Sequence, residues 1–243
     1  MYYFISDLHL GVADKNTELY KQNLFVKLLR RLENDAKTLF ILGDLFDYWF
    51  DYKHVIPKEF FRVLTSLYEF RIKGIPVIYL MGNHDFGHNG FFENELNINV
   101  IKDDLEIELE GKKFYLSHGD GKTIFDRPYL FLRGILRNPI LLWLYRKLHP
   151  DFAINLAVAS SQKSRNHSEK KKFSEIEGMD DFAKEKIQQG FDYVIMGHRH
   201  IAKILQINNG TYVNIGDWIK KPTMVHFDGN EIKLLYVEQF LES

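Results

Sequence analysis

Five short polar clusters follow apolar runs in this sequence, and their side chains are of types that bind metal ions. The clusters are Asp7-Leu8-His9, Gly43-Asp44, Gly82-Asn83-His84-Asp85, His118-Gly119-Asp120 and Gly197-His198-Arg199-His200. Imidazole, carboxylate and amide donors without sulfur favour Mn, Fe, Zn or Ni over a soft-metal site. One such cluster alone would be a turn, a helix cap or a core histidine, but five in this order indicate a shared metal centre.

The spacing inside the clusters supports the same interpretation. Asp7 and His9 are two residues apart, as are His198 and His200, so each pair is expected to project to one side of an extended segment. Asp44 stands alone after its apolar run and is the natural candidate to bridge two ions. Glycines beside the clusters, at 43, 82, 119 and 197, would let the backbone approach the ions closely.

The elements that must position these clusters are short strands alternating with amphipathic helices. Runs rich in β-branched and aromatic residues predict buried strands at 2–5, 38–42, 76–81 and 192–196. Helical spacing of apolar residues predicts helices at 18–34 and 57–73. This order predicts a mostly parallel sheet with right-handed crossovers, and the clusters would lie along its carboxyl-terminal edge.

Turn residues elsewhere in the chain predict hairpins and a second, more antiparallel sheet. The hairpins centre on Glu110-Gly111, Asn209-Gly210 and Asp228-Gly229. A chain of 243 residues with 45% hydrophobic content can bury one sizeable core. We therefore expect a single domain, 1–243, with a helical insertion at 121–178 that separates the cluster at His118 from the cluster at His198.

Charge and composition exclude several classes of protein. The 32 Lys and Arg residues nearly balance the 33 Asp and Glu residues, so no basic field indicates a nucleic-acid partner. Cysteine is absent, which excludes disulfides and thiolate metal sites. The first ten residues lack the charged start and long apolar run of a signal peptide, so we expect a cytoplasmic protein. No feature of the sequence predicts an oligomeric state.

The order of the clusters, from Asp7 to His200, resembles the signature of the calcineurin-like metallophosphoesterase family: Asp-x-His, Gly-Asp, Gly-Asn-His-Asp, His and Gly-His-x-His. The resemblance implies an α/β fold in which two packed mixed β-sheets are flanked by helices (α-β-β-α). It also implies two divalent metal ions, with Mn²⁺ first among the candidates. By resemblance, the first ion is held by Asp7, His9, Asp44 and His200, and the second by Asp44, Asn83, His118 and His198.

Two such ions would make the protein a phosphoester or phosphoanhydride hydrolase. Divalent ions about 3.5 to 4 Å apart lower the pKa of a shared water, so that hydroxide exists at neutral pH and attacks phosphorus in line. His84 is not needed as a ligand, and the family pattern implies that it donates a proton to the leaving oxygen or stabilises its charge. Asp85 would hold the other ring nitrogen of His84.

The insertion at 121–178 is the part of the sequence that bears on the substrate. Its apolar residues between 131 and 148 are interrupted by basic residues at 133, 137, 146 and 147, and no apolar run approaches the length of a membrane span. One interpretation is a pair of core helices broken at Asn138-Pro139. The other is an apolar lid beside the metal centre, with basic residues facing anionic headgroups, suited to acyl chains and a membrane surface.

The blocks ISDLHL, LGDLFDYW, GNHDF, HGD and GHRH, with the apolar insertion, resemble the UDP-2,3-diacylglucosamine diphosphatase family of lipid A synthesis. This resemblance implies hydrolysis of a nucleotide-linked glycolipid to UMP and 2,3-diacylglucosamine 1-phosphate, in peripheral contact with the cytoplasmic face of the inner membrane. By position it implies substrate contacts by Asn83, Asp126, Ser161, Arg165 and His198. The best-known members carry Arg where this chain has His84, which follows the wider metallophosphoesterase pattern.

Two alternatives share parts of this pattern. A phosphodiesterase that acts on another phosphodiester or nucleotide would use the same metal centre, although a nuclease would need a basic groove with stacking aromatics. A non-catalytic scaffold could use the same fold. Such scaffolds usually lose ligands, and all seven expected ligands are present in this chain.

Overall fold

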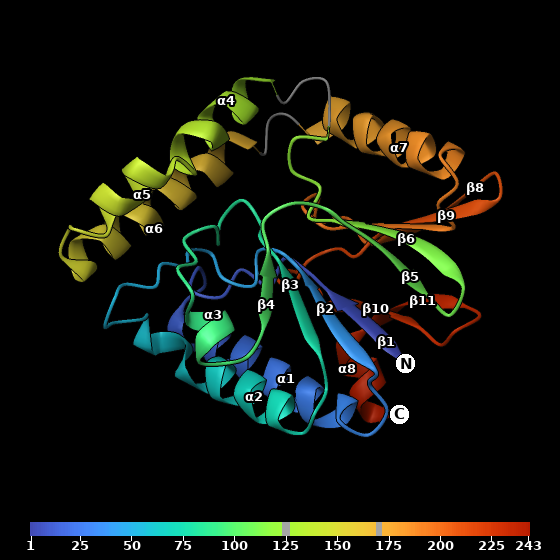
Figure 1. Ribbon diagram of the computed structural model, residues 1–243, viewed down its shortest axis with the longest axis horizontal. Helices are drawn as coiled ribbons and strands as arrows, with labels where there is room; N and C mark the ends of the chain where they lie inside the picture. The colour runs from blue at the N-terminus through green and yellow to red at the C-terminus, as the bar shows by residue number, and fades with distance from the viewer. Residues whose placement is uncertain (123–126, 169–171) are drawn as a thin grey trace.

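The computed structural model describes residues 1–122, 127–168 and 172–243 of the chain. For 127–129, 132, 162–168 and 172–177 it describes the backbone alone. Within these ranges the strands form two sheets that stack on each other, with helices on the outer face of each (Figure 1). The predicted α/β fold of two packed mixed sheets flanked by helices is confirmed.

The first sheet has six strands in the order β11-β10-β1-β2-β3-β4. Neighbours from β1 to β4 are parallel, and β10 and β11 extend the sheet by antiparallel pairing. Its strands are β1 (Tyr2–Ile5), β2 (Thr38–Leu42), β3 (Val77–Leu80), β4 (Asn99–Ile101), β10 (Thr223–Phe227) and β11 (Ile232–Tyr236). The predicted strands at 2–5 and 38–42 are confirmed to the residue, and the strand predicted at 76–81 is shorter by one residue at each end.

The second sheet has five strands in the order β5-β6-β7-β9-β8. Its three central strands are parallel, and β5 and β8 pair antiparallel at its edges. Its strands are β5 (Leu105–Leu109), β6 (Lys112–Ser117), β7 (Tyr193–Met196), β8 (Lys203–Ile207) and β9 (Gly210–Asn214). The hairpins expected at Glu110-Gly111 and near Asn209-Gly210 are therefore present.

The assignment of strands to sheets differs from the sequence prediction in two places. The strand predicted at 192–196 is β7, which lies in the second sheet between β6 and β9 rather than beside β1, β2 and β3. The hairpin at Asp228-Gly229 joins β10 and β11, which belong to the first sheet. Both errors have one cause: the residue pattern of a strand or hairpin does not say which sheet it joins.

Alternating residues of the strands separate the layers of the core. Tyr3 and Ile5 of β1 face a cluster formed with the outer helices, whereas Phe4 between them faces the second sheet. The Phe4 ring stacks on Phe40 of β2 at 4.9 Å between ring centroids and on Phe114 of β6 at 6.0 Å. This period-two alternation fixes the register in which the two sheets stack, and with it the positions of the strand ends.

Helices cover the outer faces of both sheets (Figure 1). The first sheet is covered by α1 (Lys15–Leu32), α2 (Phe61–Ile72) and the short α8 (Val237–Glu242). The second is covered by α7 (Lys172–Gln188), which buries Met179, Ala183 and Ile187 against it. The helix predicted at 18–34 starts three residues earlier, and the one predicted at 57–73 divides into the 3₁₀ turn η1 (Lys58–Phe60) and α2. A further short helix, α3 (Phe91–Asn94), precedes β4.

Three helices of the insertion, α4 (Arg127–Leu136), α5 (Pro139–Tyr145) and α6 (Pro150–Ser168), lie together away from the sheets (Figure 1). The break between α4 and α5 falls at Asn138-Pro139 as predicted, because the Asn138 side chain accepts hydrogen bonds from the backbone N–H groups of Ile140 and Leu141. No residue of α5 is buried, so this helix is not part of a core pair. The bounds of the insertion, 121–178, stay a prediction.

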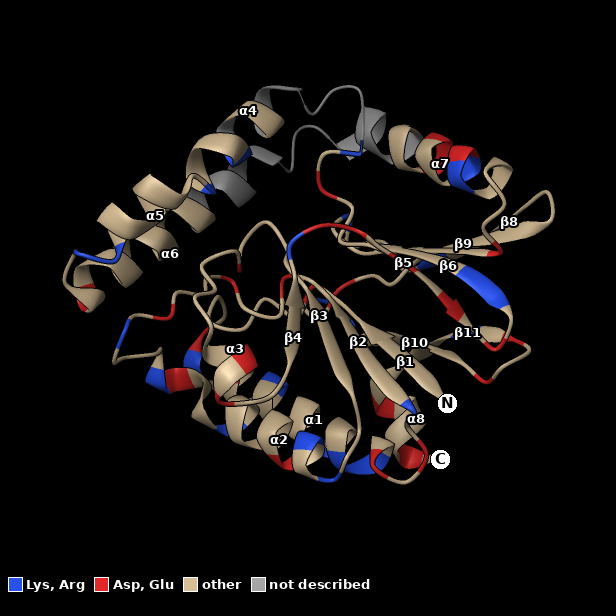
Figure 2. Cartoon of the chain, in the orientation of Figure 1, with Lys and Arg blue, Asp and Glu red and all other residues tan. Residues whose placement is uncertain are grey.

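Charged residues are unevenly distributed over the helices (Figure 2). Figure 2 shows both signs of charge on α1 and α2, whereas the described parts of α4, α5 and α6 are mostly uncharged. Among the residues that the structure describes, no helix combines the length and the apolar character needed to cross a membrane.

Candidate metal centre

The metal-binding clusters of the sequence meet where strands of both sheets end. The loops after β1, β2 and β3 come from the first sheet, and the loops after β6 and β7 come from the second. Backbone hydrogen bonds tie these loops together within each sheet: Asp7 N donates to Gly43 O at 3.2 Å in the first, and Gly197 N donates to His118 O at 3.0 Å in the second. Between the sheets, Trp218 N in the loop after β9 donates to Asp7 O at 3.1 Å. The stacking of the sheets therefore brings the five clusters to one place.

The first group of candidate ligands is formed by Asp7, His9 and His200. Asp7 Oδ1 lies 3.7 Å from His9 Nε2 and 3.2 Å from His200 Nε2, and these two nitrogens are 3.1 Å apart. Asp7 Oδ1 is fully buried and yet accepts no well-aligned hydrogen bond. A buried carboxylate oxygen without a donor, facing two imidazole nitrogens, fits a cation ligand.

The second group adjoins the first through Asp44. Asp44 Oδ2 lies 3.6 Å from His9 Nε2 and 3.3 Å from His118 Nε2. His118 Nε2 is in turn 2.9 Å from the amide oxygen of Asn83. Asp44 thus lies between the two groups, where a bridging carboxylate would have to be.

His198 is close to the second group, but its imidazole lies outside the three-residue groups found among the described side chains. Its ring packs edge-on against His118, with 5.1 Å between the ring centroids, and its backbone N–H donates to Asp7 Oδ2 at 2.8 Å. Burial, together with the positive charge of His118, lowers the pKa of His198 to about 3. A neutral imidazole is the form that binds metal ions.

The charges of the site are mutually dependent. Burial alone would raise the pKa of Asp7, but the neighbouring imidazoles of His200 and His9 hold it well below its usual range. Burial likewise opposes ionisation of Asp44, and the charges of His118 and His84 lower its pKa in spite of this. Burial lowers the pKa of His9, yet Asp47 and Asp7 raise it to about 9. The buried carboxylates therefore require positive charge, which two divalent ions would supply.

The spacing argument assumed an extended backbone at the ligands, but the backbone there is left-handed. Asp7, His9, Asp44, His198 and His200 have φ between 46° and 69°. Positive φ costs a non-glycine residue about 1–3 kcal/mol and occurs mainly at functional sites, held by the surrounding structure. Each ligand pair converges because the chain turns sharply after the strand and not because its side chains alternate along one.

Glycines permit the close packing of these loops, as expected. A Cβ on Gly82 would lie 2.1 Å from Asp44 Oδ1, and a Cβ on Gly197 would lie 2.3 Å from Asp7 Oδ2. Neither contact is sterically possible, so both carboxylates occupy space that only glycine leaves open.

Three of the candidate histidine ligands make a polar contact through Nδ1, the ring nitrogen that faces away from the metal site. His9 Nδ1 is 3.2 Å from Asp47 Oδ1, His118 Nδ1 is 2.8 Å from the Leu42 carbonyl, and His200 Nδ1 is 3.8 Å from Asp217 Oδ2. Such partners fix the tautomer and orientation of ligating histidines. The sequence argument missed Asp47 and Asp217, although Gly216-Asp217 follows β9 in the same way that Gly43-Asp44 follows β2.

The carboxylate beside His84 is Asp47, not Asp85 as predicted. His84 Nδ1 is 3.5 Å from Asp47 Oδ1 and 3.2 Å from the Asp47 carbonyl oxygen, and His84 also forms a group with His9 and Asp44. Asp85 is fully buried and accepts hydrogen bonds from the N–H groups of Leu45 and Gly82 at 2.8 Å, and from the Tyr79 hydroxyl. Burial and the Asp44 charge raise the pKa of Asp85 to about 6. Asp85 braces the loops and does not contact the His84 ring.

The three predicted substrate contacts in the insertion fall in different places. Ser161 on α6 is described and buried, and its hydroxyl donates to Asp47 Oδ2 at 2.8 Å. Asp126 lies outside the described residues, and Arg165 lies on α6 with a side chain outside the description.

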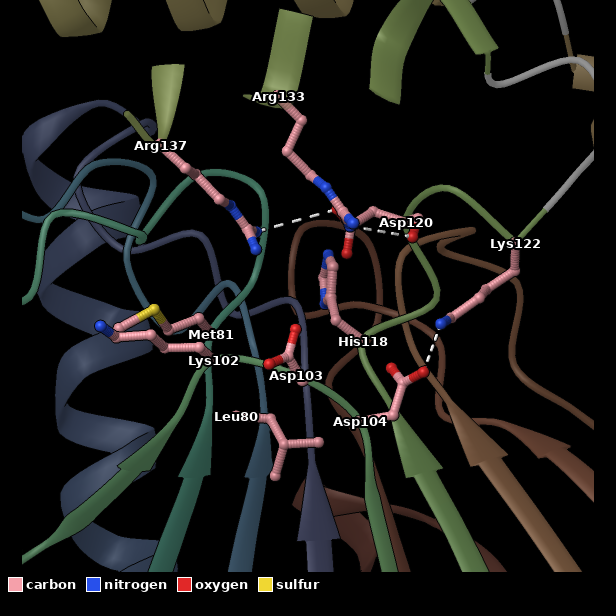
Figure 3. A pocket seen from close by; sticks show the side chains of 10 residues that line it. All are labelled: Leu80, Met81, Lys102, Asp103, Asp104, His118, Asp120, Lys122, Arg133 and Arg137. Atoms are coloured by element: carbon pink, nitrogen blue, oxygen red, sulfur yellow. Dashed lines mark hydrogen bonds and ion pairs between the residues drawn. The ribbon is translucent and has the colours of Figure 1, made fainter. Parts of the chain in front are cut away.

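A polar pocket opens beside His118 (Figure 3). Arg133 of α4 and Arg137, the residue after α4, reach down toward Asp120, with nitrogen–oxygen distances of 2.8 and 3.8 Å. Arg137 Nη2 also donates to the Gly82 carbonyl at 2.7 Å. The guanidinium groups can offset negative charge on a phosphoryl substrate at the second ligand group.

Comparison with known proteins covers both the metal centre and the insertion. The family model described as Calcineurin-like phosphoesterase matches residues 2–202. The UDP-2,3-diacylglucosamine hydrolase of Porphyromonas gingivalis is 32% identical to the chain, over 97% of each protein, and that of Haemophilus influenzae is 32% identical over 90% of each. A solved archaeal phosphodiesterase aligns at 15% identity and a TM-score of 0.48, over 97% of this chain and 98% of that one, a likeness too weak to carry an argument.

The close packing of Gly82 against Asp44 allows a test of whether Asp44 is a metal ligand. Gly82→Ala is expected to displace the Asp44 carboxylate and to weaken Mn²⁺ binding about tenfold or more, because the added methyl group occupies the position of Oδ1. Gly134→Ala is the control, since its Cβ would meet no atom within 4 Å. Metal bound per chain is measured at fixed free Mn²⁺. Normal metal binding by Gly82→Ala would contradict the assignment of Asp44 as a ligand.

Proposed function

The chain belongs to the calcineurin-like phosphoesterase family and is a metal-dependent hydrolase, and we propose that its substrate is UDP-2,3-diacylglucosamine. The reaction is hydrolysis of the pyrophosphate bond, which gives UMP and 2,3-diacylglucosamine 1-phosphate. One observation carries this proposal: the helices that expose apolar side chains also contact the metal loops, through Arg137 at the end of α4 and Ser161 of α6. A substrate with a pyrophosphate and two acyl chains needs both surfaces at once.

The apolar lid surface is the set of exposed hydrophobic side chains on α4, α5 and α6. Phe131 is 74% exposed, Ile140 68% and Trp143 57%. Its other members are Leu130, Ile135, Leu136, Leu141, Leu144, Phe152 and Leu156. Exposed apolar groups gathered on one structural unit mark an interaction surface, and each side chain buried against lipid contributes about 1.5 to 3 kcal/mol. This surface suits acyl chains and peripheral contact with a membrane.

The arginines of the insertion have a different use from the one predicted. Arg133 pairs with Asp120, Arg137 bonds the Gly82 carbonyl, and Arg146 Nη2 donates to the Gly87 and His88 carbonyls at 3.2 and 3.1 Å. These three groups hold the insertion to the metal loops instead of facing lipid headgroups. Lys147 is exposed, with its ammonium group 5.0 Å from the centroid of the Trp143 ring, and it keeps the predicted role. Membrane contact therefore rests on the apolar lid surface together with Lys147, and its dependence on salt is weaker than four basic residues would give.

We assign the metal ligands in two sets that share one carboxylate. The first set is Asp7, His9, Asp44 and His200, and the second is Asp44, Asn83, His118 and His198. Oxygen and imidazole donors without sulfur suit Mn²⁺, and Fe, Zn and Ni accept the same set. The ions, when bound, supply water activation and charge neutralisation at the phosphoryl group.

The protein's own groups bind and orient the substrate around this centre. Asn83 and His198 contact the phosphoryl oxygens, while Asp126 and Arg165 contact the polar head of the substrate. The family resemblance places Ser161 in the same set, but this residue is 7% exposed and its hydroxyl already donates to Asp47, which favours a role within the protein. His84, beside His9 and Asp44, donates a proton to the leaving phosphoryl oxygen or stabilises its charge.

The substrate proposal is tested by product analysis. Purified protein with Mn²⁺ is expected to release UMP from UDP-2,3-diacylglucosamine, because the lid and the metal centre act on one molecule. A chelator should abolish the release, and added Mn²⁺ should restore it. The same preparation is assayed on a small soluble phosphodiester as the matched substrate. Faster turnover of the small substrate, with no UMP from the glycolipid, would identify a generic phosphodiesterase.

The role of His84 is separable from metal binding. His84→Gln is expected to lower kcat by about 10²- to 10⁴-fold while the metal content stays normal. The fall in kcat should be smaller for a substrate with a good leaving group, because its leaving oxygen needs little protonation. Equal losses for good and poor leaving groups would rule out proton donation.

The apolar lid surface is tested by removing two of its members. Leu141→Ser with Trp143→Ser is expected to raise KM for the diacylated substrate by about tenfold or more, since two apolar contacts are lost. Hydrolysis of a soluble phosphodiester should persist. The matched control is Phe61→Ser with Ile72→Ser on α2, residues that are 70% and 65% exposed. If the double variant loses thermal stability together with activity on both the glycolipid and the soluble phosphodiester, α5 has a structural role and does not bind acyl chains.

A further inference from the structure

Asp47 is a buried carboxylate that the metal-ligand sets leave out. It follows β2 three residues after Asp44 and is 2% exposed. Its three oxygen atoms contact three different side chains: Oδ1 is 3.2 Å from His9 Nδ1, Oδ2 accepts from Ser161 Oγ at 2.8 Å, and the carbonyl oxygen is 3.2 Å from His84 Nδ1. Asp47 is therefore the residue at which the insertion, a metal ligand and the candidate proton donor meet.

The contact with His9 determines the form of that imidazole. His9 Nε2 faces Asp7 and Asp44 at 3.7 and 3.6 Å, so this nitrogen must present a lone pair if it binds a cation. The proton of the neutral ring then lies on Nδ1 and is donated to Asp47 Oδ1. An acceptor at this position holds the ring in the ligating tautomer and orientation.

Ser161 connects this arrangement to α6. Its single hydroxyl proton goes to Asp47 Oδ2, so Ser161 Oγ is left as an acceptor, and it lies 3.2 Å from His84 Nδ1. An N–H at His84 Nδ1 can thus be shared between Ser161 Oγ and the Asp47 carbonyl oxygen. Asp47 lies 38 residues from His9 and 114 residues from Ser161 in the sequence. The pairing of the loops after β1 and β2 brings Asp47 to His9, and the seating of α6 on these loops brings Ser161 to Asp47.

We propose that Asp47 is a positioning residue through which the insertion orders the metal centre. Ser161 holds the Asp47 carboxylate, the carboxylate holds His9, and the Asp47 carbonyl and the Ser161 hydroxyl together hold His84. When α6 is seated, the first ligand set and the candidate proton donor are both oriented. The lid is then part of the catalytic apparatus as well as a surface for acyl chains. The statement about turnover rests on the proposed function, whereas the statement about metal binding does not.

Metal binding to substrate-free protein is the first measurement. Asp47→Asn keeps the size of the side chain but removes its charge, and we expect Mn²⁺ affinity to fall about 10- to 100-fold. Ser161→Ala should give a smaller loss in the same direction, because the carboxylate stays but loses its donor. Ser161→Thr keeps the hydroxyl and should restore most of the affinity. Ser160→Ala, at an exposed neighbour on α6, is the matched control.

Coupling between the two residues is the second measurement. If Ser161 acts through Asp47, the double variant Asp47→Asn with Ser161→Ala should bind Mn²⁺ no more weakly than Asp47→Asn alone. At saturating Mn²⁺, Ser161→Ala should lower kcat and leave KM for the glycolipid near normal, because the hydroxyl contacts the protein and not the substrate.

Three results would overturn the proposal. The first is unchanged Mn²⁺ affinity in both Asp47→Asn and Ser161→Ala, and the second is fully additive losses in the double variant. The third is a rise in KM alone for Ser161→Ala, which would make Ser161 a substrate contact. If Asp47→Asn does not fold, the comparison of Ser161→Ala, Ser161→Thr and Ser160→Ala decides the matter. Failure to release UMP, with Mn²⁺ affinity still dependent on Asp47, would count against the proposed substrate only.

Discussion

The structure depends on the neutralisation of two buried carboxylates, Asp7 and Asp44. A buried carboxylate is stable only when charge and hydrogen bonds compensate its lost hydration. Imidazole nitrogens of His9, His118 and His200 lie 3.2 to 3.7 Å from their oxygens. Left-handed residues and tightly packed glycines are the conformational cost of placing so many groups at one point. The negative charge gathered at this point is what two divalent cations would compensate.

The stacked sheets explain why this point exists. Parallel strands in each sheet end on the same side, and the stacking of the sheets brings the two sets of ends together. The insertion starts after the loop at His118 and ends before the strand that leads to His198. Both ends of the insertion are therefore close to ligands, and the polar contacts described for Arg133, Arg137 and Ser161 connect its apolar surface to the metal loops.

Local patterns predicted much of this molecule correctly. The strands at 2–5 and 38–42, the break at Asn138-Pro139 and the clusters that follow the strands are all properties of short segments. The two-residue and helical periodicities of apolar residues are properties of short segments, so they can be recognised in the sequence alone. The membership of β7 and β10 in their sheets was predicted wrongly, because hydrophobic runs do not say which partner strand they pair with.

The sequence by itself determined which donor types the site contains, in what order, and that they follow strands. The tertiary structure decided how those donors are oriented. It placed Asp47 and not Asp85 beside His84, turned three arginines of the insertion toward the metal loops, and gave the ligands a left-handed backbone. The physical reason is distance along the chain. A hydrogen bond between residues 38 or 114 positions apart is set by how whole layers pack, and no local spacing encodes it.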